Sequence, residues 1–245
     1  MCAVLCVIFL NLNFFTMANL AIIPARGGSK RIPRKNIKNF LGKPIIAYSI
    51  EVAIKSGLFD EIMVSTDDNE IAKVGITYGA KIPFYRSALN SNDFATTMDV
   101  IDEVLNEYSS RDKYFENVCC IYPTAPLINV DDLLNGHEIL TKNKEIDVVY
   151  PITNFSYPIL RSLIIEENGT VKMKWPEYQK TRSQDLQPAY HDCGQWYWYS
   201  MESLNKRDFS IIKPIILDGF RVQDIDNEED WKLAEMKYKV NNNFI

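Results

Sequence analysis

Short apolar runs alternate along the chain with segments in which apolar residues recur every three or four positions. The short runs, rich in β-branched residues, predict strands at residues 20–24, 61–66, 81–85, 117–122, 147–152 and 196–199. The longer periodic segments predict helices at residues 45–56, 98–108, 130–140 and 228–238, with a further helix opening at 67–70. Alternation of this kind is typical of an α/β fold with a mostly parallel sheet.

Residues that commonly cap helices stand beside two of these segments. Gly57 follows the helix predicted over residues 45–56, and a glycine just beyond the last turn often ends a helix. Asp67, with Glu70 three residues later, predicts an N-cap and a capping glutamate for the next helix. Capping is sufficient to explain the pair of Asp67 and Asp68, so we treat it as structural rather than as a metal site.

The composition of the sequence changes between residues 153 and 200. Aromatic, proline and β-branched residues are frequent there, and helical patterns are few. No internal repeat or low-complexity linker divides the chain. We therefore interpret residues 17–245 as a single domain with an irregular insertion at 153–190.

Residues 1–16 form a separate feature. They carry no charged side chain, so the lysine or arginine that precedes the apolar part of a signal peptide is missing. Asn11 and Asn13 interrupt the apolar run too early for a membrane span, which needs about 20 residues. We expect residues 1–16 to be an N-terminal extension, with Met17 as an alternative start.

The charge balance limits the classes of partner. The chain has 27 Lys and Arg residues against 32 Asp and Glu, a formal net charge of -5, which argues against a sequence-independent nucleic-acid binder. Hydrophobic residues at 47% and charged residues at 24% are typical of a globular protein, not of a disordered or multiply membrane-spanning one.

Cysteine and histidine usage bears on metal binding and on the compartment. The five cysteines include no C-x-x-C pair, and the chain has only two histidines, which leaves almost no ligands for zinc. Cys119 and Cys120 lie in an apolar run, where buried reduced thiols are expected. We therefore expect a cytoplasmic protein.

The segment 24–36 concentrates residues that bind anions. It directly follows a predicted strand, and open α/β folds bind ligands at the carboxyl ends of their strands. Gly27, Gly28 and Ser29 leave backbone N–H groups free to face an anion. Five cations surround them: Arg26, Lys30, Arg31, Arg34 and Lys35. This local reversal of charge predicts a polyphosphate ligand. Neither standard glycine-rich phosphate motif is present, and a solvated basic loop is the alternative.

Asp224 and Asp226 are the candidate metal ligands. In an extended segment they share one face, with Ile225 directed toward the core. Two carboxylates on one edge suit Mg²⁺, or Mn²⁺, held together with substrate phosphates. The alternative is that Asp226 caps the helix predicted at 228–238.

Two further features are candidates for proton transfer and for sugar binding. His191 is a candidate base, but a lone histidine is more often a hydrogen-bonding residue. Several aromatic residues offer surfaces for stacking on a sugar, although at strand spacing half of them belong in the core: Tyr190, Trp196, Tyr197, Trp198 and Tyr199.

Several motifs together resemble the CMP-sugar synthetases, cytidylyltransferases that activate sialic acid and related nonulosonic acids. The resemblance runs from about residue 19 to residue 238 and begins with Ile23-Pro24-Ala25-Arg26-Gly27-Gly28-Ser29-Lys30, Pro33 and Lys35-Asn36. The pseudaminic acid branch is indicated by Arg31-Ile32-Pro33-Arg34-Lys35-Asn36, Tyr122-Pro123-Thr124-Ala125-Pro126, Thr181-Arg182-Ser183-Gln184-Asp185, Tyr190-His191-Asp192 and Val222-Gln223-Asp224-Ile225-Asp226. The resemblance implies a Rossmann-like fold of the nucleotide-diphospho-sugar-transferase type, with helices on both faces of the sheet and an inserted dimerisation arm.

The resemblance also implies an activity and a nucleotide site. CMP passes from CTP to the anomeric hydroxyl of the sugar, pyrophosphate leaves, and the product serves surface or flagellar glycan synthesis. The implied nucleotide-binding residues are Ala25, Arg26, Gly27, Gly28, Ser29, Lys35, Asn36, Arg86, Ala95 and Thr97. The implied catalytic residues are Arg26, Lys35, Asp224 and Asp226, the two aspartates as ligands of Mg²⁺.

Tyr122 departs from the sialic acid synthetases, which carry at this position a glutamine that touches the sugar. A tyrosine lacks that amide, which favours another nonulosonic acid. The insertion at 153–190 matches the arm through which the family dimerises and completes the partner's sugar pocket, so a homodimer is implied. The implied sugar-binding residues are Tyr122, Thr124, Arg182, Gln184, His191, Asp192 and Gln195.

Three alternatives stay open. Synthesis of CMP-N-acetylneuraminate or CMP-legionaminate keeps the chemistry and changes the sugar. A metal-dependent glycosyltransferase also uses a D-x-D pair, but usually directly after its nucleotide-binding half. A non-catalytic nucleotide sensor binds CTP without needing the aspartate pair.

Overall fold

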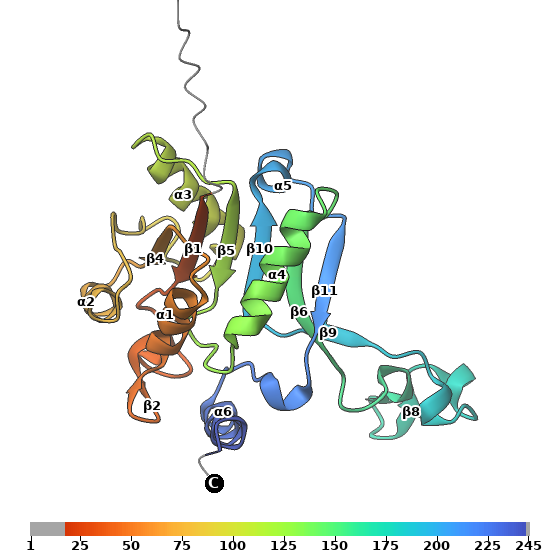
Figure 1. Ribbon diagram of the computed structural model, residues 1–245. Coiled ribbons are helices and arrows are strands. Elements are labelled where there is room, and N and C mark those ends of the chain that lie inside the picture. Colours follow the sequence, from red (N-terminus) through yellow and green to blue (C-terminus); the bar gives the residue numbers. More distant parts are fainter. Residues whose placement is uncertain (1–17, 244–245) are drawn as a thin grey trace, which may run out of the picture.

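A mixed sheet forms the centre of the protein. The computed structural model describes residues 18–243, so the predicted extension at 1–16 and the alternative start at Met17 lie outside the described residues. Seven strands pair in the order β11-β6-β10-β5-β1-β4, with β9 added beside β6 (Figure 1). They span Asn19–Pro24 (β1), Glu61–Ser65 (β4), Asn117–Ile121 (β5), Val148–Asn154 (β6), Tyr190–Asp192 (β9), Trp196–Ser200 (β10) and Ile212–Ile216 (β11). Strand β1 runs parallel to β4 and β5, and β11 runs parallel to β6. Strand β10 runs antiparallel to β5 and β6, and β9 runs antiparallel to β6. The predicted α/β fold with a mostly parallel sheet is confirmed.

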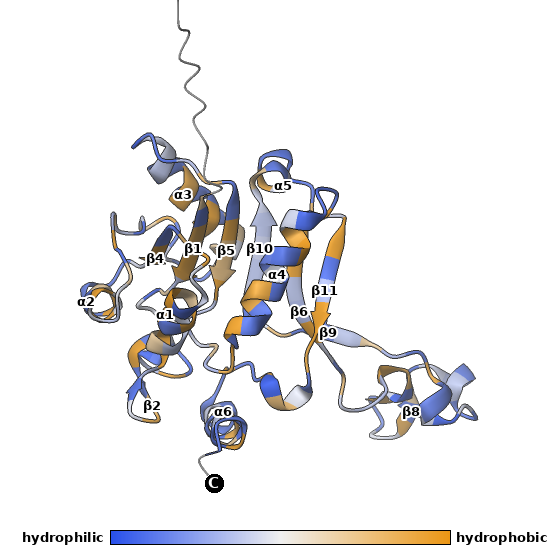
Figure 2. Ribbon diagram, viewed as in Figure 1, coloured by the Kyte–Doolittle hydropathy of each residue, from blue (hydrophilic) through white to orange (hydrophobic). Residues whose placement is uncertain are grey.

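Helices cover both faces of this sheet. They span Ile45–Ser56 (α1), Asn69–Thr77 (α2), Thr97–Ser109 (α3), Val130–Lys142 (α4), Met201–Lys206 (α5) and Glu228–Asn241 (α6). Ala21 and Ile23 of β1 belong to a buried cluster with α1 and α4, which lie in front of the sheet in Figure 1. Leu20 and Ile22 belong to a second cluster with α3, because alternate residues of a strand face opposite sides. The central strands β1 and β5 are therefore mostly hydrophobic (Figure 2).

A third buried cluster fastens the C-terminal helix to the N-terminal loop. Ile225 and Trp231, just before and within α6, pack with Ile32, Phe40 and Ile45. Small elements complete this region: a turn at Lys35–Ile37 (η1), the strands Asn39–Phe40 (β2) and Lys43–Pro44 (β3), and a turn at Gly219–Arg221 (η5). The packing places the segment that precedes α6 beside residues 24–36, which we call the cationic loop, although almost 200 positions separate them in the sequence.

Residues 155–189 form an arm that extends away from the sheet between β6 and β9 (Figure 1). The arm contains a hairpin of Leu163–Ile165 (β7) and Val171–Met173 (β8), and turns at Ile159–Arg161 (η2), Pro176–Tyr178 (η3) and Ser183–Asp185 (η4). Its apolar side chains are largely exposed, including Tyr157 at 85% and Ile165 at 78%. Across residues 18–243, no helix has the length and apolar character needed to cross a membrane.

Two predictions of local structure are wrong. Residues 81–85 do not form a strand; Lys81 makes only an isolated bridge to Met63. The N-cap of α2 is Asp68 rather than Asp67: its carboxylate accepts hydrogen bonds from the N–H groups of Glu70 and Ile71. Asp67 instead contacts the cationic loop: its carboxylate accepts a hydrogen bond from the N–H of Gly27 at 3.0 Å.

Candidate active site

Two adjoining cavities open where β1 and β5 end. The first, which we call the cationic cavity, has a volume of about 390 Å³ and brings together the predicted residues Arg26, Ser29, Lys35, Asn36, Thr124 and Asp226. The second, which we call the side cavity, has a volume of about 250 Å³ and brings together the predicted residues Arg26, Arg86, Ala95, Thr97 and Tyr122. Pro24, Arg26 and Pro123 line both, so the two cavities form one cleft at the carboxyl ends of parallel strands.

The cations of the loop are already paired within the protein. Arg26 donates to Asp93 at 2.7 Å, and Lys30 donates to the other oxygen of the same carboxylate. Arg31 donates to Asp226 at 2.7 Å. Sequence reasoning missed Asp93, which lies 67 positions from Arg26 in a polar loop that shows no motif. The loop is therefore a cationic surface whose charge is balanced by carboxylates at its rim.

Arg34 holds the loop against the start of α2 rather than facing the cleft. Its guanidinium donates to both oxygens of Asp68, at 2.6 and 2.9 Å, and to Glu70 at 2.6 Å. The hydrogen bonds from Arg34 lower the pKa of Asp68 well below its ordinary value. Arg34 has a φ of 56°, in the left-handed region that non-glycine residues rarely occupy. This strained residue and its two carboxylate partners fix the path of the loop.

Gly27 lies too close to α2 for any side chain. A Cβ at this position would come within 2.9 Å of an Asp68 oxygen that Arg34 holds in place, whereas a Cβ at Gly28 would meet nothing within 4 Å. The expectation that all three N–H groups of Gly27, Gly28 and Ser29 are free to face an anion is only partly met. The N–H of Gly27 donates to Asp67, and that of Ser29 donates to the carbonyl of Gly27 at 3.1 Å.

Lys35 and Asn36 tie the loop to the rest of the cleft. The Lys35 ammonium donates to the carbonyl of Ile225 at 2.6 Å, and the Asn36 amide donates to the carbonyl of Arg26 at 2.9 Å. Burial lowers the pKa of Lys35, although the nearby Asp226 and Asp224 favour its charged form. Ala25 is fully buried and continues the strand, with its N–H bonded to the carbonyl of Ser65. Ala25 therefore belongs to the core and lines neither cavity of the cleft.

Asp224 and Asp226 flank a residue that is completely buried. Ile225 has no exposed surface, so the alternation expected from the sequence is present. The N-cap of α6 is Asn227, which forms a capping box with Asp230, so the alternative role of Asp226 as the cap is excluded. Burial, and then repulsion from Asp226, raise the pKa of Asp224. A cation would relieve this repulsion, and the two carboxylates are suitable ligands for Mg²⁺.

Arg86 is a buried residue that lines the side cavity. It is 8% exposed, and its Nε donates to the hydroxyl of Ser65 at 3.0 Å. Burial lowers its pKa to about 10. The hydroxyls of Thr97 and Tyr122, which line the same cavity, lie 3.1 Å apart, and Ala95 is held by a hydrogen bond from its N–H to Asn92. The side cavity thus combines a fixed guanidinium with hydroxyl and backbone groups.

The predicted sugar-binding residues fall into separate places. Arg182 and Gln184 lie on the arm and line neither cavity of the cleft, and Arg182 pairs with Asp185 at 2.7 Å. His191 is exposed on β9 with its Nδ1 at 2.8 Å from the carbonyl of Asp192. Gln195 is 2% exposed and donates to the carbonyl of Arg221 at 2.7 Å, so it lies below the surface.

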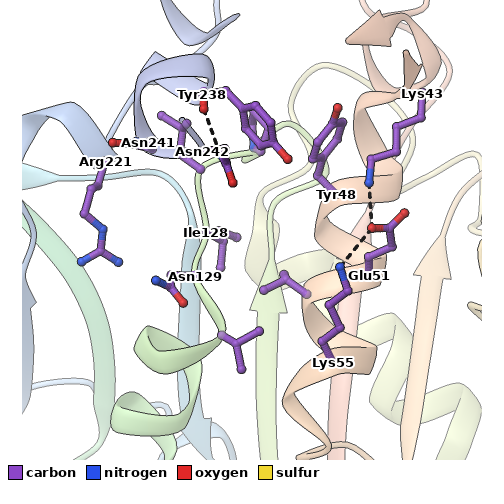
Figure 3. A pocket seen from close by; sticks show the side chains of 14 residues that line it. Lys43, Tyr48, Glu51, Lys55, Ile128, Asn129, Arg221, Tyr238, Asn241 and Asn242 are labelled. Carbon is purple, nitrogen blue, oxygen red and sulfur yellow. Dashed lines mark hydrogen bonds and ion pairs between the residues drawn. The ribbon is translucent and has the colours of Figure 1, made fainter. Parts of the chain in front are cut away.

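A third cavity, of about 430 Å³, lies between α1, α6 and the residues that lead into α4 (Figure 3). Lys43 and Lys55 both approach Glu51 there, at 2.7 and 3.5 Å. Arg221 pairs with Asp132. None of the predicted site residues lines it. Because the predicted residues gather in the cleft and not in this cavity, the cleft is the candidate active site.

Comparison with known proteins points to one family. Residues 20–165 match the family described as cytidylyltransferase. The pseudaminic acid cytidylyltransferase of Campylobacter jejuni subsp. jejuni is 45% identical, over 92% of this chain and 98% of the relative. The CMP-N,N'-diacetyllegionaminic acid synthase of Legionella pneumophila subsp. pneumophila is 33% identical, over 92% of this chain and 98% of the relative. A solved structure of CMP:2-keto-3-deoxy-manno-octonic acid synthetase complexed with CTP shares the fold, with a TM-score of 0.66 at 16% identity, over 92% of this chain and 99% of that one. This chain belongs to the cytidylyltransferase family.

Proposed function

We propose that this protein transfers CMP from CTP to the anomeric hydroxyl of pseudaminic acid. The observation that carries the proposal is the 45% identity to the Campylobacter pseudaminic acid cytidylyltransferase across 98% of that relative. Tyr122, which lines the side cavity, agrees with a sugar other than sialic acid. The sugar oxygen forms a bond to the α-phosphorus, the bond from that phosphorus to the bridging oxygen breaks, and pyrophosphate leaves while the hydroxyl loses its proton.

Charge neutralisation and positioning account for most of the catalysis in such a transfer. The cationic cavity is the proposed site of the triphosphate, where Arg26 and Lys35 offset the charge that builds on the leaving pyrophosphate. Asn36 supports this site through its bond to the carbonyl of Arg26. The N–H of Gly28 and the hydroxyl of Ser29 are the proposed donors to phosphate oxygens.

The side cavity is the proposed site of the cytosine and ribose. Arg86, already desolvated and fixed by Ser65, needs no reorganisation before it donates to the cytosine carbonyl. The backbone of Ala95 and the hydroxyl of Thr97 complete the contacts with the nucleotide.

Asp224 and Asp226 are the proposed ligands of Mg²⁺ or Mn²⁺. Their fit rests on two observations: Asp226 is not the cap of α6, and burial together with the nearby Asp226 carboxylate raises the pKa of Asp224. When bound, the ion supplies Lewis-acid stabilisation and orientation of the α-phosphate. Arg31, which now pairs with Asp226, balances the charge of that carboxylate before the ion arrives.

The arm is the proposed dimer contact. Its hairpin exposes Leu163, Ile165 and Val171, apolar residues that a second copy of the chain would cover. In such a dimer Arg182 and Gln184 reach the partner's sugar pocket, which explains why they line no cavity of their own cleft. Sedimentation-equilibrium mass at micromolar concentration tests the dimer. The described cysteines, Cys119, Cys120 and Cys193, are buried and unpaired, as suits a cytoplasmic enzyme.

Pyrophosphate release with CTP and Mg²⁺ tests the function directly. Pseudaminic, N-acetylneuraminic and N,N'-diacetyllegionaminic acids are supplied in parallel, and release is expected with pseudaminic acid at the highest kcat/KM. Preference for the legionaminic acid would keep the chemistry and change the sugar, in line with the 33% identity to the Legionella enzyme. Binding of CTP without turnover of any of the three sugars would favour a nucleotide sensor.

A further inference from the structure

Three tyrosine rings form a continuous row on the face of the sheet opposite α4. Tyr122 follows β5, Tyr197 lies on β10 and Tyr150 lies on β6, and β10 lies between the other two strands. The ring centroids of Tyr122 and Tyr197 are 5.4 Å apart, and those of Tyr197 and Tyr150 are 5.5 Å apart. All three side chains are only partly buried, so the row presents aromatic surface to a ligand.

The row begins at the nucleotide cleft. Tyr122 lines the side cavity, and its hydroxyl lies 3.1 Å from that of Thr97, the first residue of α3. The proposed nucleotide site and the tyrosine row therefore share a residue. A molecule lying along the row would have one end beside the bound nucleotide, where the acceptor hydroxyl must be.

The row continues to a carboxylate that is held in one orientation. The Tyr197 hydroxyl lies 2.8 and 2.9 Å from the two oxygens of Asp192, to which it donates, and the N–H of Gly194 donates to the same carboxylate at 2.7 Å. Asp192 is exposed on β9. An ionised carboxylate can accept about four hydrogen bonds, so these donors leave acceptor sites free.

We propose that Tyr197 is a positioning residue for the acceptor sugar: it holds the Asp192 carboxylate to accept an N–H or O–H of a sugar that lies on the rings of Tyr122, Tyr150 and Tyr197. This inference rests on the proposed function and names how the sugar is recognised. The chemical class it fits is a sugar acid with amide N–H donors and methyl groups. Aromatic rings bury methyl groups, and the oriented carboxylate pairs with an amide N–H.

The two parts of this surface contribute differently to specificity. An apolar wall discriminates weakly against an added hydroxyl, by about 100-fold at most, whereas a polar partner left unpaired costs much more. Asp192 therefore supplies most of the discrimination, and the orientation given by Tyr197 decides how well it does so.

The first test is Tyr197→Phe, which removes the hydroxyl and keeps the ring. With CTP and pseudaminic acid, the KM for the sugar is expected to rise about tenfold, since a hydrogen bond that orients a charged group is lost. The kcat and the KM for CTP are expected to stay within about twofold. Tyr199→Phe is the matched control: Tyr199 is two residues along the same strand and face, and its ring contacts are with Phe209 and Tyr197. It should leave both KM values unchanged.

The second test is a double-mutant cycle with Asp192→Asn. If Tyr197 acts through Asp192, Tyr197→Phe adds less than about twofold to the KM for the sugar in the Asp192→Asn background. Additive effects, an unchanged KM in Tyr197→Phe, or equal rises in both KM values would overturn the proposal. Melting temperatures of all variants separate these outcomes from loss of folding. Failure of the unmodified protein to turn over any of the sugars would refute the proposed function itself.

Discussion

The guanidinium of Arg26 lies 2.7 Å from the Asp93 carboxylate, and both residues line the cationic cavity. Asp93 also pairs with Lys30, so one carboxylate holds two of the cations that would face a triphosphate. The hydrogen bonds from Lys30 and Arg26 lower the pKa of Asp93, which keeps it ionised. A triphosphate in the proposed site would compete with Asp93 for Arg26 and Lys30.

Asp93→Asn is therefore expected to strengthen CTP binding. The neutral amide competes less well for Arg26 and Lys30, and the KM for CTP should fall about two- to fivefold, the range set by exposed ion pairs. Steady-state kinetics at two salt concentrations checks this, because the gain should shrink as salt screens the charges. A higher KM for CTP would mean that Asp93 instead stabilises the loop conformation that binds CTP.

Arg26→Ala should lower kcat by about 100-fold or more, as does loss of other preorganised charge contacts with a transition state. Single-turnover rates at saturating CTP measure the effect apart from binding. Arg111→Ala is the control, since Arg111 follows the C-terminal end of α3 and pairs with Glu107 on the same helix. A wild-type rate in Arg26→Ala would remove its proposed role at the phosphates.

Asp226→Ala should abolish transfer and leave the fold intact. The carboxylate is not the cap of α6, and its pairing with Arg31 is an exposed contact that contributes little stability. Glu228→Ala, which removes another exposed carboxylate two residues later, should keep full activity. Pyrophosphate release over a series of Mg²⁺ concentrations, together with thermal unfolding, checks both variants. Near-native turnover in Asp226→Ala would contradict the assignment of the metal ligands.

Local signals in the sequence were enough for the elements with strong periodicity. The helix α1 begins and ends at the predicted residues because its apolar face is regular and Gly57, at a φ of 64°, stops it. The edge strand β11 was not predicted, because Pro214 interrupts its pattern. A proline is tolerated there since one side of an edge strand has no ladder partner.

Long-range pairing explains what the sequence could not reveal about the cleft. The cluster of cations and the aspartate pair were visible as motifs, and the structure brings Arg26, Lys35 and Asp226 to one cavity. The choice of Asp68 over Asp67 as the cap of α2 depends on Arg34 and Gly27, which lie 34 and 40 positions away from their partners. Asp93 and Tyr197 acquire their partners only through folding.

Gly27→Ala is expected to destabilise the protein, whereas Gly28→Ala is not. The new methyl group at position 27 would lie 2.9 Å from an Asp68 oxygen, and Arg34 prevents that carboxylate from moving aside. Overpacking of this kind costs about 1–3 kcal/mol of unfolding free energy. Urea denaturation without nucleotide compares the two variants under conditions where no ligand contact contributes. Equal stability of both variants would show that the close contact between Gly27 and Asp68 does not fix the path of the loop.

Glu61 makes the stability of the fold depend on pH. Its side chain is 3% exposed; burial alone would raise its pKa, but hydrogen bonds from Lys113, Lys81 and Tyr108 lower it overall. A carboxylate with a lowered pKa in the folded state stabilises above its unfolded pKa, about 4.3, and this contribution is lost as pH falls through the folded value.

Glu61→Gln should therefore reduce the free energy of unfolding at pH 7 by about 1–3 kcal/mol, because a charge-assisted hydrogen-bond network is weakened. The difference from the unmodified protein should shrink as pH falls below the unfolded pKa and through the lower folded value, where the native carboxyl also becomes neutral. Glu107→Gln, at an exposed pair on α3, should change stability by less than about 0.5 kcal/mol throughout. Urea denaturation at pH 7, 5 and 3.5 measures all three proteins. If the unfolding free energy of Glu61→Gln stays lower by the same amount at all three pH values, the effect comes from packing rather than from charge.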